Sequence, residues 1–145
     1  MAVFIGLSVH ASDCTSLIGT CEYYQCVEKT EQCGSKGYYL KFGKHYCEKY
    51  KNDQAKYSEK GQEFLIKIRS CLQQGLELEH TNTNKYPKCD DALKFAVGTH
   101  KSCYTKYGFC DLPSDDKARI KRTAKKELIH FQMLLFGFWL EKACL

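Results

Sequence analysis

The chain of 145 residues lacks the cysteine spacing of a structural zinc site, although it contains ten cysteines. Such sites use close pairs such as C-x2-C, matched by a second pair of Cys or His downstream. No C-x2-C occurs in the sequence, and the five histidines are scattered singly at positions 10, 45, 80, 100 and 130. The pattern therefore predicts no metal site and no cofactor.

Long apolar runs and strand-like alternation are also missing. The longest apolar stretch, Phe131 to Leu140, includes Gln132 and is shorter than the roughly 18 residues of a membrane span. No internal repeat and no N-x-S/T sequon occurs. We therefore expect a soluble all-α domain without N-glycosylation.

A complete catalytic set is lacking as well. Residues 100–104 read His-Lys-Ser-Cys-Tyr, which resembles the H-D-x-C-Y pattern of secreted phospholipases A2. In that family the histidine is the general base and the aspartate holds calcium, but Lys101 is a cation and cannot ligate calcium. We expect His100 to be a partly buried structural histidine and the protein not to be an enzyme. A lipid hydrolase centred on His100 stays as an alternative.

The ten cysteines, from Cys14 to Cys144, indicate an oxidising compartment, because their even number allows complete pairing as disulfides. The run from Ala2 to Val9 is apolar, and Ala11 follows it as a small residue at a plausible cleavage site. We interpret residues 1–11 as a signal peptide, truncated if its missing basic residues lay further upstream, with an ordinary apolar N-terminal segment as the alternative, because no Lys or Arg precedes the run. Residues 12–145 are then one secreted, extracellular domain, or a periplasmic one if the source is bacterial.

The periodicity predicts three to five helices stapled by disulfides, after a Cys-, Gly- and Tyr-rich N-terminal part. Asp13 to Gly43 is predicted to form short helical turns and loops. Phe64 and Leu72 lie on one helical stripe, which Gly75 is expected to end as a C-cap. The polar stretch from Glu79 to Pro87 is predicted to be a loop.

Two further helices are expected. The first begins at Asp90-Asp91, where carboxylates favour a helix N-terminus, and it ends at Gly108. The second begins after Pro113, with Ser114 as its N-cap, and continues to Leu140.

The net charge of +5 is concentrated near the beginning of this last helix. The run could bind a polyanion or an anionic lipid, as a saposin-like lipid binder would, or it could be a solvated helix face. Nucleic acid is not expected, since an exported protein seldom meets it. The residues are Lys117, Arg119, Lys121, Arg122, Lys125 and Lys126.

The order of the cysteines resembles that of stanniocalcins, a family of secreted helical glycoprotein hormones. Cys21-Glu-Tyr-Tyr-Gln-Cys26 is similar to that family's C-x4-C, and Cys71-Leu-Gln-Gln-Gly75 to its C-I-A-N-G. The segment Cys89-x13-Cys103-Tyr-Thr-Lys-x3-Cys110 resembles C-x13-C-Y-S-K-x3-C. The likeness covers Cys14 to Cys144.

The resemblance implies one disulfide pairing out of 945 and a function. The function is that of a non-enzymatic, hormone-like signalling protein that binds another protein, linked to the regulation of calcium and phosphate. Stanniocalcins join two subunits through an eleventh cysteine, which has no counterpart before Leu145, so a homodimer would be non-covalent. The implied bridges are Cys14–Cys26, Cys21–Cys47, Cys33–Cys89, Cys71–Cys103 and Cys110–Cys144.

Overall fold

The computed structural model describes residues 13–127 and 131–145, so the expected signal peptide lies outside the described residues. The described part is all-α and has no strand, which confirms the predicted fold class. It contains six α-helices, one more than the expected range, because both ends of the chain are divided further than predicted. They are α1 (Glu22–Glu31), α2 (His45–Asn52), α3 (Glu59–Thr83), α4 (Ala92–Lys106), α5 (Ser114–Ala124) and α6 (Phe131–Ala143).

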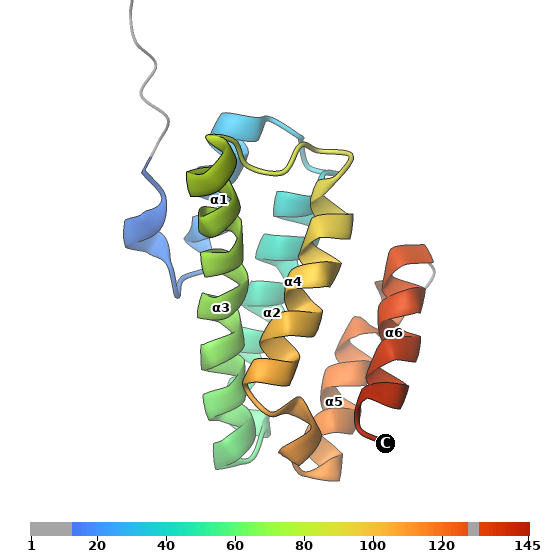
Figure 1. Ribbon diagram of the computed structural model, residues 1–145. Coiled ribbons are helices and arrows are strands. Elements are labelled where there is room, and N and C mark those ends of the chain that lie inside the picture. Colours follow the sequence, from blue (N-terminus) through green and yellow to red (C-terminus); the bar gives the residue numbers. More distant parts are fainter. Residues whose placement is uncertain (1–12, 128–130) are drawn as a thin grey trace, which may run out of the picture.

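The helices pack around a central pair. Figure 1 shows α3 and α4 side by side, with α2 behind them and with α5 and α6 beside α4. The pair is crosslinked by the Cys71–Cys103 disulfide. In the described residues, no helix has both the length and the apolar character that crossing a membrane would require.

The N-terminal part is more regular than predicted. Besides α1, a π-helical segment spans Tyr39–Lys44 and continues directly into α2. The Tyr24 ring lies against Gly43 so closely that a Cβ atom there would be 2.5 Å from the ring carbon Cδ1. The prediction of short turns and loops is therefore wrong for residues 22–31 and 39–43, which are helical.

Helix α3 is longer than its sequence pattern indicated. It runs through Gly75, where a Cβ atom would be 2.5 Å from Thr99 Cγ2, so this glycine permits the close approach of α4. The helix ends before Asn84, which adopts a left-handed conformation with φ of 58°. The C-cap at Gly75 and the loop from residue 79 are thus wrong, and the connection begins only at Asn84.

The predicted boundaries of the later helices agree with the structure in part. Helix α4 follows Asp91, and Gly108 lies just beyond its end with φ of 72°, both near the predicted positions. The N-cap of α5 is Pro113 and Ser114 is the first residue of the helix, so the predicted N-cap role of Ser114 is wrong. The single long final helix is also wrong, because α5 ends at Ala124 and α6 begins at Phe131.

Two clusters of buried side chains make up the core. One joins α3 and α4 to α5 and α6 and includes Phe64, Tyr104 and Phe136. The other joins α1 and the π-helical segment to α3 and α4 and includes Tyr23 and Leu76. At the edge of this second cluster, the buried amide of Gln73 binds the loop before α1. It accepts a hydrogen bond from the Gly19 N–H and donates one to the Thr20 carbonyl, both at 2.7 Å.

Every cysteine is paired. The pairs coincide with those that the stanniocalcin resemblance implies. The bridges are Cys14–Cys26, Cys21–Cys47, Cys33–Cys89, Cys71–Cys103 and Cys110–Cys144.

Candidate functional site

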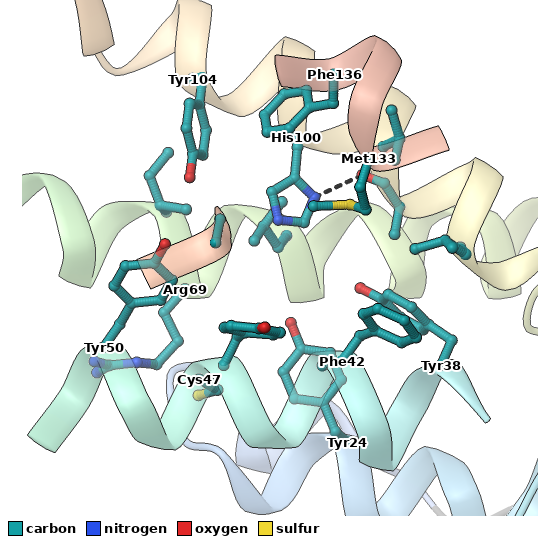
Figure 2. Close-up of a pocket in the computed structure, with 18 of the residues that line it drawn as sticks. Tyr24, Tyr38, Phe42, Cys47, Tyr50, Arg69, His100, Tyr104, Met133 and Phe136 are labelled. Atoms are coloured by element: carbon teal, nitrogen blue, oxygen red, sulfur yellow. Dashed lines mark hydrogen bonds between the residues drawn. The ribbon is translucent and has the colours of Figure 1, made fainter. Parts of the chain in front are cut away.

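A cavity of about 110 Å³ lies where the two buried clusters meet. All six α-helices and the π-helical segment contribute to its wall. Seven aromatic rings line it, and the other wall residues are mostly aliphatic. Figure 2 shows Tyr24, Tyr38 and Phe42 along one side, with Phe136 and Met133 of α6 on the opposite side.

Arg69 of α3 is the only Lys, Arg, Asp or Glu among the described residues that line this cavity. Its half-buried guanidinium group donates one long hydrogen bond, 3.4 Å, to Gln54 Oε1. No carboxylate of the described residues lies within ion-pair distance of it. Desolvation by burial lowers the pKa of Arg69, and the nearby Tyr24 acts weakly in the opposite direction. This positive charge is therefore held beside an apolar space without an ionic partner in the described chain.

His100 of α4 also lines the cavity. Its ring atom Nδ1 lies 2.7 Å from the Ala96 carbonyl oxygen, an acceptor, which assigns the proton to Nδ1. Nε2 then carries a lone pair and has no hydrogen-bond partner among the described residues. Burial lowers the pKa of His100, although the bond to Ala96 offsets part of the effect. The ring is thus a neutral, half-buried part of the wall, and it contacts the rings of Tyr104 and Phe136.

The neighbouring Lys101 does not join His100 in a catalytic arrangement. Its ammonium group lies 6.0 Å from the ring of Trp139 on α6, as a cation–π contact. Among the described residues, no group of three or more His, Cys, Asp or Glu is arranged to hold a metal ion.

A second cavity of about 230 Å³ lies between α4, α5 and α6. It shares four wall residues with the first, namely Tyr104, Ala124, Met133 and Phe136. Lys121 and Glu141 form an ion pair of 2.6 Å at its wall. Met133 and Phe136 of α6 thus line both cavities.

Three of the six basic residues of the predicted run make contacts within the molecule. Lys117 donates to the Cys110 carbonyl at 3.1 Å, Arg119 lies 5.6 Å from the Tyr57 ring, and Lys121 is paired with Glu141. Arg122, Lys125 and Lys126 are exposed. Half of the run is thus occupied by contacts within the molecule.

The cavity and Arg69 were missed by reasoning from sequence, although one signal existed. Leu65, Leu72 and Leu76 recur at the spacing of a buried helix face, and Arg69 occupies the position between the first two. A charged residue on such a stripe indicates either a buried ion pair or a polar group facing a cavity.

Taken together, these features define a small, disulfide-stapled, all-α protein with an apolar interior cavity and one unpaired cation in its wall. No family model, curated protein or solved structure matches this chain.

Proposed function

We propose that this chain is an exported, non-enzymatic binding protein of stanniocalcin-like construction that acts by engaging another protein. The observation that carries the proposal is the disulfide pairing. Five bridges join the cysteines in the pairs that the stanniocalcin resemblance implies, out of the 945 pairings that ten cysteines allow. So many bridges are characteristic of proteins from oxidising compartments.

The environment of His100 supports a binding role over the lipid-hydrolase alternative. A general base needs access to a water molecule and to the reacting bond, whereas this ring lies in a wall made mostly of aromatic and aliphatic side chains. The residue at the calcium-ligand position, Lys101, contacts Trp139 instead. The saposin-like alternative has less support from the basic run, since three of its six cations make contacts within the molecule.

Secretion with complete disulfide pairing and partner binding can be tested with the tagged chain, placed behind a signal peptide of the host and expressed in a host with a secretory pathway. We expect the protein in the medium, with five intramolecular bridges and no free thiol in a peptide map. We also expect it to capture a specific protein from the extracellular fluid of its source. The same protein after reduction and alkylation is the matched control, and it should lose that capture. Retention in the cytosol with reduced thiols would overturn the proposal.

The hydrolase alternative has its own test. Fatty acid release from mixed phospholipid micelles is measured with calcium, for the unmodified protein and for His100→Gln. The proposal of a non-enzymatic protein requires no release from either. Calcium-dependent release that His100→Gln abolishes would replace it with the lipid-hydrolase reading.

A further inference from the structure

The half-buried charge of Arg69 lies in the wall of an apolar cavity and has no ionic partner among the described residues. A guanidinium group that is removed from water destabilises the fold unless hydrogen bonds or an opposite charge compensate it. The one hydrogen bond to Gln54 is long and involves a neutral acceptor. The planar donors of arginine match a carboxylate in a two-point contact. The position therefore fits an anionic group supplied from outside the described chain.

The rest of the wall restricts what that anion can be. A strongly hydrated inorganic anion such as phosphate would have to lose its water beside seven aromatic rings. A carboxylate that carries a hydrocarbon tail instead gains from the burial of that tail, by about 0.8 kcal/mol for each methylene group. The neutral Nε2 of His100 presents a lone pair, so it repels a carboxylate and favours the position at Arg69.

The two cavities together suit a chain-like tail. The first, of about 110 Å³, holds only a few methylene groups, but the second adds about 230 Å³ behind Met133 and Phe136. Their combined size reaches the lower end of typical ligand pockets, about 300 Å³. In Figure 2, Arg69 lies on the α2 side of the cavity and Met133 and Phe136 on the far side, so head and tail would point in opposite directions.

We propose that the cavity binds a medium-chain monocarboxylate, with its carboxylate on Arg69 and its tail directed past Met133 and Phe136 toward the second cavity. The site goes beyond the proposed function and stands whether or not the protein is exported or engages a protein partner.

Calorimetric titration of the disulfide-intact protein with decanoate tests the head group. We expect saturable binding of one decanoate per chain, weakened about ten- to a hundredfold by Arg69→Gln through loss of the charge-assisted hydrogen bonds. Decanol, which has the same tail and no charge, should bind both proteins alike. Arg122→Gln makes the same change of charge at an exposed site and should leave decanoate binding unchanged. Absence of saturable binding, or equal binding by Arg69→Gln, would overturn the proposal.

The direction of the tail is tested with chain length. Affinity should rise from butyrate to decanoate in the unmodified protein. In Ala124→Phe, which places a ring where both cavities share a wall, that rise should stop. If the rise persists, the tail does not reach the second cavity and this assignment is wrong.

Helical circular dichroism and a peptide map establish that each variant is folded. If Arg69→Gln does not fold, Arg69→Lys replaces it. Lysine keeps the charge but lacks the planar fork, so the affinity for decanoate should fall by about tenfold.

Discussion

The Asp116 carboxylate of α5 holds Ser58 at the start of α3, 58 residues earlier in the chain. Its Oδ1 accepts the Ser58 N–H at 3.1 Å, and its Oδ2 accepts the Ser58 hydroxyl at 2.5 Å. The same hydroxyl oxygen accepts the Gly61 N–H at 3.1 Å and so caps α3. Asp116 is 4% exposed, so the two helices share one buried polar contact. An acidic residue in the first turn of one helix thus stabilises the N-terminus of another.

Replacement of this carboxylate should destabilise the protein more than replacement of its neighbour. Asp116→Asn substitutes an NH2 group for one of two accepting oxygens, and we expect the free energy of unfolding to fall by about 1–3 kcal/mol. Asp115→Asn removes the same charge from an exposed side chain, and its effect should be within about 0.5 kcal/mol. Urea unfolding with the disulfides intact measures both. Equal effects would show that the contact with Ser58 contributes little.

Two helical glycines should respond oppositely to alanine. A Cβ atom at Gly61 would collide with the Asp116 carboxylate, whereas a Cβ atom at Gly98 would meet no atom within 4 Å. Alanine favours helix by about 1 kcal/mol over glycine. Thermal unfolding should therefore show Gly98→Ala more stable by about 0.5–1 kcal/mol and Gly61→Ala less stable by about 1–3 kcal/mol. Stabilisation by both would contradict the close approach of α5 to α3.

The half-buried His100 should make stability depend on pH. Burial lowers its pKa below the ordinary value of 6.5, so the unfolded chain binds a proton at a higher pH than the folded one. This contribution to stability is complete above about pH 6.5 and is lost as the pH falls through the lowered pKa. Burial raises the pKa of Glu31 above its ordinary value of 4.5. Glu31 therefore stabilises the folded protein as the pH falls toward that value, which is opposite to the effect of His100.

Urea unfolding between pH 7 and 5 should therefore show a decline for the unmodified protein that is reduced in His100→Gln. His45→Gln is the matched control, because that ring lies outside the cavity. An unchanged slope in His100→Gln would mean that the ring is not desolvated.

The bridges should be reduced in an order set by the exposure of their sulfur atoms, since exchange needs access for the attacking thiol or phosphine. Cys110 and Cys144 are both exposed, whereas Cys14 is fully buried and its partner Cys26 nearly so. Partial reduction with a phosphine, followed by alkylation and peptide mapping, should label Cys110 and Cys144 first. Labelling of Cys14 ahead of them would contradict the burial of the first bridge.

The sequence predicted those helix ends that are determined by neighbouring residues in the chain. Asp91 and Gly108 flank α4 because a carboxylate suits a helix start and glycine suits the left-handed conformation after a helix end. It failed where glycine has a tertiary role. Gly75 was expected to end its helix, but it instead allows Thr99 to approach the helix closely, as Gly43 allows Tyr24 to do. Such contacts depend on residues distant in the chain, and local periodicity carries no information about them.

The candidate site was less predictable than the fold. The expectation that His100 is partly buried agrees with its position on α4. The cavity itself could not be foreseen, since it arises from the imperfect meeting of two clusters on several helices. The one indication of the cavity in the sequence was Arg69, a charged residue on an otherwise apolar helix face.

The order of the bridges along the chain has a topological consequence. Each bridge from Cys14–Cys26 to Cys71–Cys103 overlaps the next in sequence, but the last begins at Cys110, beyond the end of the others. Between Cys14 and Cys144, a single backbone cleavage therefore splits the molecule into two covalent fragments only if it falls between Cys103 and Cys110. Lys106, an exposed tryptic site, lies in that interval. One cut there would leave α5 and α6 attached to the rest by non-covalent contacts alone.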